Sequence, residues 1–163
     1  MSLKTAKKQN LILDFDFTLC DSSVRENAHT VNDTLNLVNY LQDTAQHDNA
    51  LPLLCYIFRN RQALEYKYNI LVLTNRDFNR DCKSKIVRLI KRTYPCIHRG
   101  IYAPIYGDNF KSFALKRLAN NNTIFIDDDP LYLNMAREQN ARAICARDLW
   151  HYTPHDFTEL FFG

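Results

Sequence analysis

Glycine is scarce in this chain: only Gly100, Gly107 and Gly163 among its 163 residues are glycine. The Walker A loop and the Gly-x-Gly-x-x-Gly dinucleotide fingerprint each need several glycines at fixed spacing, because the backbone must approach the phosphates closely. Three widely spaced glycines form neither pattern. The sequence therefore excludes a kinase or a dinucleotide enzyme that uses either loop.

Long apolar segments are also missing, and no run approaches the length of a membrane span. The N-terminus carries Lys4, Lys7 and Lys8, but the short apolar segment after them contains acidic residues, unlike a signal peptide. We therefore expect a soluble cytoplasmic protein with no membrane partner.

Cysteine is present but forms no Cys-x-x-Cys pair. The five cysteines lie mostly in apolar patterns: Cys20, Cys55, Cys82, Cys96 and Cys145. This favours buried free thiols in a reducing compartment over zinc ligands or a disulfide framework. The length allows one sizeable core and leaves little room for a second, so we expect residues 1–163 to form a single domain.

Two carboxylates end the first apolar run of the chain, which spans residues 11–19 and contains Asp14 and Asp16. In an extended strand, residues two apart point to the same face, so both side chains would project into one site. Two like charges that are buried together need a cation. The same spacing occurs in strand-end turns and calcium loops, so the pair needs support from elsewhere in the sequence.

Three later segments supply that support. The apolar run 68–73 leads into Thr74, Asn75 and Arg76, whose side chains can donate hydrogen bonds to phosphoryl oxygens. Lys111 opens a predicted helix that extends to Leu118. A third apolar run, 123–126, leads directly into further carboxylates, which are Asp127, Asp128 and Asp129. Pro130 then opens the next predicted helix, and Asp129 is expected to cap it.

This order of parts resembles the haloacid dehalogenase (HAD) superfamily of phosphatases and phosphotransferases. The Asp-x-Asp-x-Thr motif matches Asp14 to Thr18, and the later motifs match Thr74, Lys111 and the Asp127–Asp128 pair. The resemblance covers roughly residues 11–148. It implies a three-layer α/β/α Rossmann-like fold with a central parallel sheet and a small helical insertion after the first strand, at about residues 20–68. Phe17 departs from the motif, because many members of the superfamily have glycine there.

The resemblance also implies a mechanism. Asp14 would be the nucleophile that forms an aspartyl phosphate, and Asp16 would be the general acid and base. Mg²⁺ would be held by the Asp14 side chain, the Asp16 carbonyl and Asp128, with Asp127 supporting these ligands or Lys111. Residues expected to bind the phosphoryl group are Thr74, Asn75, Arg76 and Lys111.

The substrate is less constrained. A short insertion, a Thr-Asn-Arg second motif and an acidic pair are similar to polynucleotide kinase-phosphatases and small nucleotidases, which implies a nucleotide or a nucleic acid 3′-phosphate end. The alternatives are a phosphoprotein substrate or a binding module without turnover.

The segment 76–99 is strongly basic. Its cations are Arg76, Arg80, Lys83, Lys85, Arg88, Lys91, Arg92 and Arg99, against Asp77 and Asp81. They would attract a polyanion if they lie near the site. They would form a solvated helix face if the apolar side chains at helical spacing, from Phe78 to Ile90, face the sheet.

Further elements follow from the sequence breaks. Helices are expected at about 24–46, 51–66, 78–93, 111–118 and 131–139, with strands at 101–103 and 142–146. The tail after Leu149 is rich in aromatic residues, which either cover the same domain or form a dimer contact, so a monomer and a homodimer both stay open. His151 and His155 have Pro154 between them and are expected at the surface.

Overall fold

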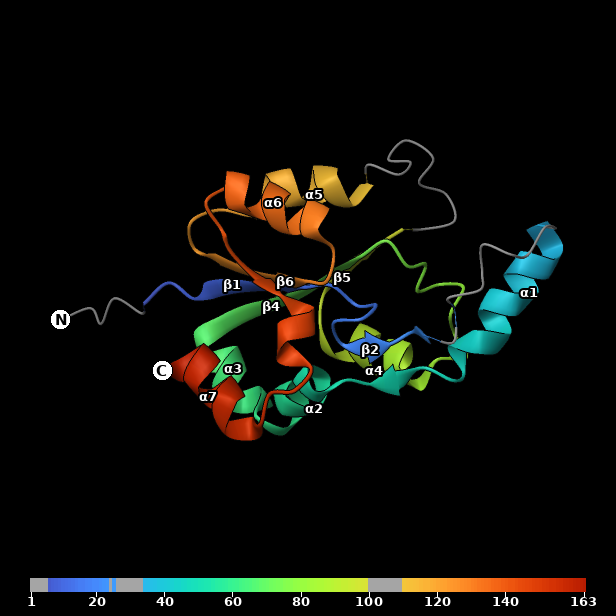
Figure 1. Ribbon diagram of the computed structural model, residues 1–163, viewed down its shortest axis with the longest axis horizontal. Coiled ribbons are helices and arrows are strands. Elements are labelled where there is room, and N and C mark those ends of the chain that lie inside the picture. The colour runs from blue at the N-terminus through green and yellow to red at the C-terminus, as the bar shows by residue number, and fades with distance from the viewer. Residues whose placement is uncertain (1–5, 24, 26–33, 100–109) are drawn as a thin grey trace.

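A computed structural model of the chain describes residues 6–23, 25, 34–99 and 110–163. A central sheet lies between two layers of helices, with α5 and α6 on one face and α2, α3, α4 and α7 on the other (Figure 1). This is the three-layer α/β/α arrangement expected from the sequence. No helix in the described part of the chain combines the length and the apolar character that crossing a bilayer requires.

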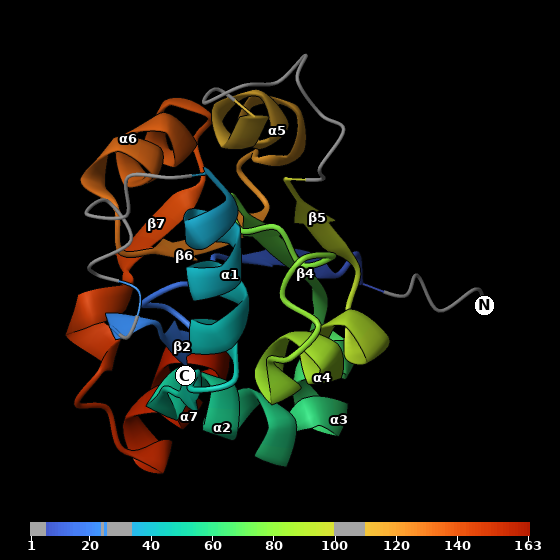
Figure 2. The same ribbon diagram turned by 90° about the vertical axis from the view of Figure 1, so that its right-hand side faces the viewer.

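All neighbouring strands of the main sheet are parallel, and the strand order is β5-β4-β1-β6-β7. Its strands are β1 (Gln9–Leu13), β4 (Tyr68–Thr74), β5 (Cys96–His98), β6 (Thr123–Asp127) and β7 (Arg142–Cys145). Leu13 pairs with Val72 of β4 and with Ile126 of β6, so the first motif begins between the ends of these two strands. Figure 2 views the sheet from the edge at which the parallel strands end.

The central strands are apolar because both of their faces are buried. Side chains of β1 alternate between two cores: Leu11 and Leu13 pack on the α2, α3, α4 and α7 side, and Ile12 packs on the α5 and α6 side. Every residue of β6, from Thr123 to Asp127, is buried. The polar motif residues therefore come where the chain leaves a sheet that is covered on both faces.

The helices of the two layers mostly follow the expected positions. They are α2 (Pro52–Arg59), α3 (Arg61–Lys67), α4 (Lys85–Thr93), α5 (Phe110–Leu118), α6 (Pro130–Glu138) and α7 (Pro154–Phe162). The helix predicted at 78–93 begins only at Lys85, where Ser84 caps it by accepting a hydrogen bond from the Val87 N–H at 3.2 Å. Turns occupy residues 78–80 and 82–83 instead.

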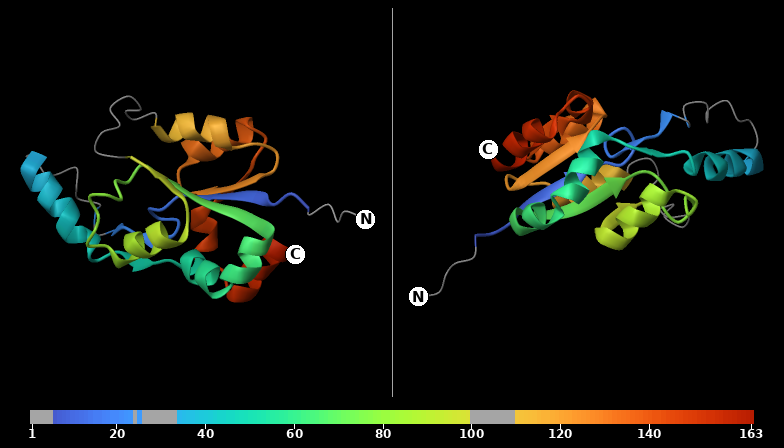
Figure 3. Two further views of the ribbon diagram at one scale, coloured as in Figure 1. Left: turned by 180° about the vertical axis from the view of Figure 1, so that it is seen from behind. Right: turned by 90° about the horizontal axis from the view of Figure 1, so that it is seen from below.

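The predicted insertion separates into two parts. Its first part, β2 (Cys20–Asp21), α1 (Thr34–Ala45) and β3 (Asn49–Ala50), lies beyond the strand ends, and α1 projects from the body (Figure 3). The antiparallel pairing of β2 with β3 closes this part at its base. In contrast, α2 and α3 pack against the sheet through Leu53, Ile57 and Leu64. Among the described residues of the insertion, the segment that projects beyond the sheet is therefore limited to β2, α1 and β3.

Two expectations fall partly outside the described residues. The strand predicted at 101–103 lies outside them, and the strand beside β4 is Cys96–His98. The first part of the helix predicted at 24–46 also lies outside them.

The aromatic residues of the C-terminal tail cover the same domain, which was one of the two possibilities that the sequence left open, the other being a dimer contact. Phe157 and Phe161 of α7 are buried, and they stack on Tyr56 with ring centroids 5.1 and 6.0 Å away. Thr153 and Asp156 form a capping box at the start of α7. His151 and His155 are exposed, as expected.

The cysteine prediction was only partly right. All five cysteines are free thiols, but Cys20 alone is buried, and Cys55 and Cys82 are exposed. Cys82 is exposed because it precedes α4 and therefore does not share the buried face of that helix. Burial raises the pKa of the Cys20 thiol to about 12.

Candidate active site

The predicted motif residues meet at the carboxyl ends of β1, β4 and β6. Asp14 follows β1 directly, Thr74 ends β4 and Asp127 ends β6. The N–H of Asp14 donates to the Ile126 carbonyl at 3.0 Å, which joins the first motif to β6. Lys111 lies in the first turn of α5 and reaches this group from the helix layer formed by α5 and α6.

Asp14 is at the centre of this group. Its carboxylate is buried, and Oδ1 accepts a hydrogen bond from the Lys111 Nζ at 2.8 Å. The same ammonium lies 2.5 Å from Asp127 Oδ2, so one cation bridges two buried carboxylates. The Thr18 hydroxyl lies 3.4 Å from the other Asp14 oxygen.

Three carboxylates share this space. Asp14, Asp127 and Asp128 each offer an oxygen, and these oxygens all lie within 4.8 Å of one another. Burial raises the pKa of the Asp14 carboxyl well above its ordinary value, although Lys111 acts in the opposite direction. Burial and the nearby Asp127 also raise the pKa of Asp128.

The charge on the group suits a divalent cation. When ionised, the three carboxylates outnumber the one buried ammonium beside them, and the Arg147 guanidinium near Asp128 is more than half exposed, so the group keeps a net negative charge. Burial opposes the charge on Lys111, but Asp14 and Asp127 together hold its pKa above the ordinary value, so the ammonium stays charged. Hard oxygen donors of this kind are ligands that Mg²⁺ accepts.

Asp16 lies apart from the three carboxylates. Its side chain is one-third exposed, and its Oδ1 accepts hydrogen bonds from the Ser22 hydroxyl and, at 3.0 Å, from the Arg76 guanidinium. A carboxylate that is accessible and held at one oxygen suits proton transfer better than metal ligation. These contacts involve the Asp16 side chain, so metal ligation by its backbone carbonyl stays a prediction.

Arg76 is buried and surrounded by acids. Besides Asp16, its guanidinium pairs with Asp48 at 2.7 Å and with Asp81. Arg25 adds a second guanidinium to Asp81 at 2.7 Å. The guanidinium donors of Arg76 already meet three carboxylates, so these contacts support a role in positioning Asp16. Direct binding of phosphate by Arg76 stays a prediction.

The other two residues of the second motif differ in exposure. Thr74 is buried, and its hydroxyl oxygen accepts a hydrogen bond from the Arg76 N–H at 3.1 Å. Asn75 is exposed and donates to the Tyr132 hydroxyl at 3.0 Å. Tyr132 also covers Lys111, with the ammonium 4.6 Å from the ring centroid.

The acidic residues at the end of β6 have three distinct environments. Asp127 is fully buried, and its Oδ1 accepts from the Asp129 N–H at 2.9 Å. Asp128 is partly exposed and lies 3.6 Å from the Arg147 guanidinium. Asp129 caps α6 by accepting from the Leu131 N–H at 2.9 Å, as expected.

Phe17 has a backbone conformation that is rare for its residue type. Its φ is 58°, in the left-handed region, which costs a non-glycine residue about 1–2 kcal/mol. Glycine adopts this conformation without that cost, which explains why the motif commonly carries glycine there. The Phe17 N–H donates to the Cys20 carbonyl at 2.7 Å, and this hydrogen bond helps to hold the turn.

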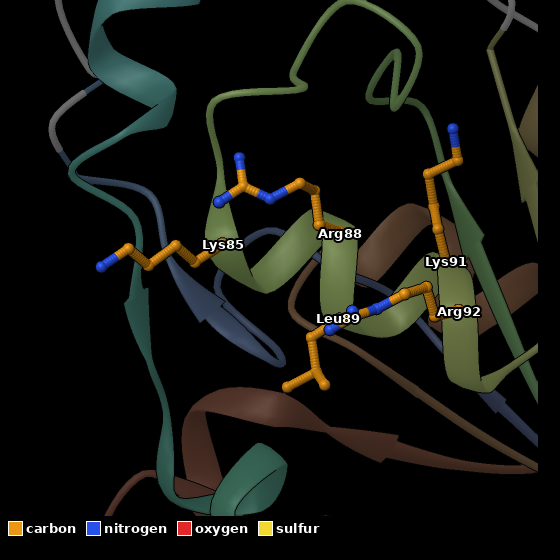
Figure 4. Close-up of a pocket in the computed structure, with 5 residues that line it drawn as sticks. All are labelled: Lys85, Arg88, Leu89, Lys91 and Arg92. Carbon is orange, nitrogen blue, oxygen red and sulfur yellow. The ribbon is translucent and has the colours of Figure 1, made fainter.

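The basic segment contributes to two different regions. Arg76 belongs to the buried network, and Lys83 pairs with Asp43 of α1 at 3.0 Å. On α4, cationic side chains surround Leu89 at a hollow of about 600 Å³ that is lined by Lys85, Arg88, Leu89, Lys91 and Arg92 (Figure 4). Val87 and Ile90 of the same helix are buried, so α4 is amphipathic, as one of the two interpretations held.

Replacing Asp128 with Asn gives a first testable prediction. Its raised pKa means that the folded protein holds a proton over a pH range just above 3.8 in which the unfolded chain has lost it, so this group costs stability as the pH rises through that range. In EDTA at pH 7 we expect Asp128→Asn to raise the free energy of unfolding by about 0.5 kcal/mol, small because solvent partly screens the group. Mg²⁺ affinity should fall at least about tenfold.

Thermal unfolding with and without Mg²⁺ measures both effects, and Asp148→Asn, at an exposed position, is the matched control. A variant that is less stable than the wild type in EDTA would contradict the proposed cost of burying the Asp128 charge near Asp127.

Several residues that contact the motif residues were missed by the sequence analysis. They are Ser22, Asp48, Asp81, Tyr132, Arg147 and Trp150. Arg25 joins them indirectly, through Asp81. Tyr132 lies one helical turn after the acidic motif, so the spacing could have suggested it. Asp48, a partner of Arg76, carried no such signal, because it lies 28 residues away in sequence.

Comparison with known proteins bears on the fold. No protein-family model matches the chain, and no curated protein matches it. Among solved structures, 17 chains match. One is a haloacid dehalogenase-like family hydrolase from Streptococcus pneumoniae, which is 14% identical with a TM-score of 0.59, covering 94% of this chain and 98% of that chain. At this identity the likeness establishes the fold, which is haloacid dehalogenase-like, as predicted from the motifs.

Proposed function

We propose that this protein is a Mg²⁺-dependent phosphomonoester hydrolase that works through an aspartyl phosphate on Asp14. The main support is the arrangement around that residue. A buried carboxylate is paired with Lys111 and grouped with Asp127 and Asp128, while the more accessible carboxylate of Asp16 lies outside the group. This separates a nucleophile from a proton carrier.

In the first step, an Asp14 oxygen attacks the phosphorus, and the bond from phosphorus to the leaving oxygen breaks. Asp16 gives its proton to that oxygen, so the leaving group departs as a neutral alcohol. Lys111, which already touches the attacking carboxylate, stabilises negative charge on the transferring group.

In the second step, Asp16 accepts a proton from water, and the resulting hydroxide attacks the phosphorus. The bond between phosphorus and Asp14 breaks, which regenerates the carboxylate and releases inorganic phosphate. Ser22 and Arg76 hold the Asp16 carboxylate for both proton transfers. Thr74 and Asn75 are the proposed hydrogen-bond donors to the phosphoryl oxygens.

Asp14 and Asp128, whose oxygens lie within 4.8 Å of each other, would hold a bound Mg²⁺ together with the Asp16 carbonyl, and Asp127 would support Lys111 and the ligand group. When bound, the ion supplies positive charge against the oxygens of the transferring phosphoryl group.

The proposed substrate is a nucleotide or a nucleic acid 3′-phosphate end. We expect phosphate release from these compounds that requires Mg²⁺ and stops with EDTA, in a panel that includes sugar phosphates and phosphopeptides. Turnover confined to phosphopeptides would identify a phosphoprotein phosphatase instead. No turnover of any compound by folded, Mg²⁺-loaded protein would favour a binding module and contradict the proposal.

A further inference from the structure

A second pocket lies beside the candidate active site. It has a volume of about 340 Å³ and is lined by Phe17, Asp21, Ser23, Leu51, Arg147 and Trp150. Phe17 is adjacent in sequence to Asp16, and Arg147 contacts Asp128. The pocket takes no part in the two proposed steps at Asp14 and Asp16. Its volume is at the small end of the range for ligand sites and suits a single ring system.

Two aromatic rings and a guanidinium form one unit in this pocket. The Trp150 indole N–H donates to the Phe17 carbonyl at 2.9 Å, which fixes one aromatic residue relative to the other. The Arg147 guanidinium carbon lies 5.0 Å from the Trp150 ring centroid and 5.9 Å from that of Phe17. The guanidinium lies over these rings, and because the Arg147 side chain is more than half exposed, its own flat outer surface is open to a planar ligand.

The strained backbone at Phe17 also supports a role for the pocket in ligand binding. A glycine would adopt its φ of 58° without strain, but would add no ring to the pocket. Strain that persists beside an active site is a reason to look for a role of the side chain that causes it.

The remaining lining groups are polar and of both signs. Asp21 supplies hydrogen-bond acceptors, whereas Ser23 and Arg147 supply donors. A nucleobase has a π face for stacking and an edge that carries both donors and acceptors. The ring of a phosphotyrosine has the face but no polar edge, because its one oxygen carries the phosphate. The polar groups therefore favour a nucleobase.

We propose that this pocket binds the nucleobase of the phosphorylated substrate, so that the leaving group is a nucleoside or a nucleotide. The inference rests on the proposed function, since it assumes that the phosphate lies at Asp14. A free nucleotide and the terminal nucleotide of a strand share this chemistry.

Trp150 makes base binding directly measurable, because it is the only tryptophan in the chain. The Asp14→Asn variant with Mg²⁺ is titrated with AMP, GMP, CMP and UMP, with the four nucleosides, with ribose 5-phosphate and with phosphotyrosine. We expect saturable fluorescence changes from nucleotides and nucleosides and none from ribose 5-phosphate. A response to phosphotyrosine alone, or an equal response to ribose 5-phosphate, would overturn the base site.

Turnover by the wild-type protein tests the same pocket independently. Phe17→Leu and Trp150→Leu should each lower kcat/KM for the best nucleotide about tenfold relative to that for glycerol phosphate. Phe113→Leu, at an exposed aromatic residue of α5, is the matched control and should leave this ratio unchanged. Comparing nucleoside 3′- and 5′-monophosphates with 3′-phosphorylated oligonucleotides separates the two sources of the base.

The two proposals fail in different ways. Fluorescence changes with nucleosides, but no phosphate release from any compound, would support the base site and overturn the hydrolase. Mg²⁺-dependent release from all phosphates at similar kcat/KM, without a nucleoside response, would support the hydrolase and overturn the base site.

Discussion

Asp14→Asn is expected to reduce phosphate release by at least about 10⁴-fold, because a carboxamide cannot replace the attacking carboxylate. The fold should persist, since Lys111 retains its ion pair with Asp127 and the variant removes a buried charge. The measurement is kcat/KM for the best substrate of the panel, together with the thermal midpoint. Asp43→Asn on α1, an exposed position, is the matched control and should have normal activity.

Asp16→Asn separates the two proposed carboxylate roles. With an alkyl phosphate, the first step slows by about 10²–10⁴-fold because the leaving oxygen receives no proton. With p-nitrophenyl phosphate the leaving group needs no proton, so the first step persists and the aspartyl phosphate accumulates. A burst of nitrophenol is the expected signal. If Asp14→Asn retained turnover within about tenfold of wild type, or also gave the burst, Asp14 would not be the nucleophile.

Arg76→Met is expected to have the largest effect on stability. The side chains of Arg76, Asp48 and Asp81 are each at most 2% exposed, so losing the guanidinium leaves buried carboxylates without their main partner. Breaking a buried ion pair on one side costs about 3–5 kcal/mol. In a chain of this length that lowers the thermal midpoint by roughly 10 °C. Arg80→Met, whose side chain is partly exposed and lies 4.0 Å from Asp77, should cost less than about 1 kcal/mol.

A double variant keeps this prediction testable even if Arg76→Met is poorly folded. Asp48→Asn in the Arg76→Met background removes one of the orphaned charges, so we expect it to restore part of the lost stability. Arg76→Lys retains the charge but not the branched donor geometry and should give an intermediate loss. Additive effects of Arg76→Met and Asp48→Asn, measured by denaturant unfolding, would contradict the network.

The network also connects the projecting segment to the site. Asp48 lies just before β3, at the base of that segment, and Arg25 donates to the Leu41 carbonyl of α1 at 2.6 Å as well as to Asp81. Arg76 joins these groups to Asp16. Loss of Arg76 should therefore disturb the orientation of Asp16 as well as the base of the insertion.

The sequence alone predicted the α/β class, the parallel sheet and the residues that meet at its edge. Apolar runs that end in Asp14, Thr74 and Asp127, together with the family resemblance that their motifs carry, led to this prediction, because the carboxyl ends of parallel strands share one edge whatever the details of the helices. The cap at Asp129 was likewise local, since its carboxylate bonds an N–H only two residues away. Such features depend on a few consecutive residues, and a sequence displays them directly.

Tertiary structure decided what those residues touch. The motif included Arg76 as a phosphate ligand, yet packing surrounds it with acids that are 5, 28 and 60 residues away. The start of α4 at Lys85 moved Cys82 to the surface, and three separate chain segments create the pocket around Trp150. Short stretches of sequence encode backbone preference and burial. Ion pairs and cavities arise only when distant segments pack together, because the free energy of an ion pair or a cavity depends on the surroundings that the whole fold creates.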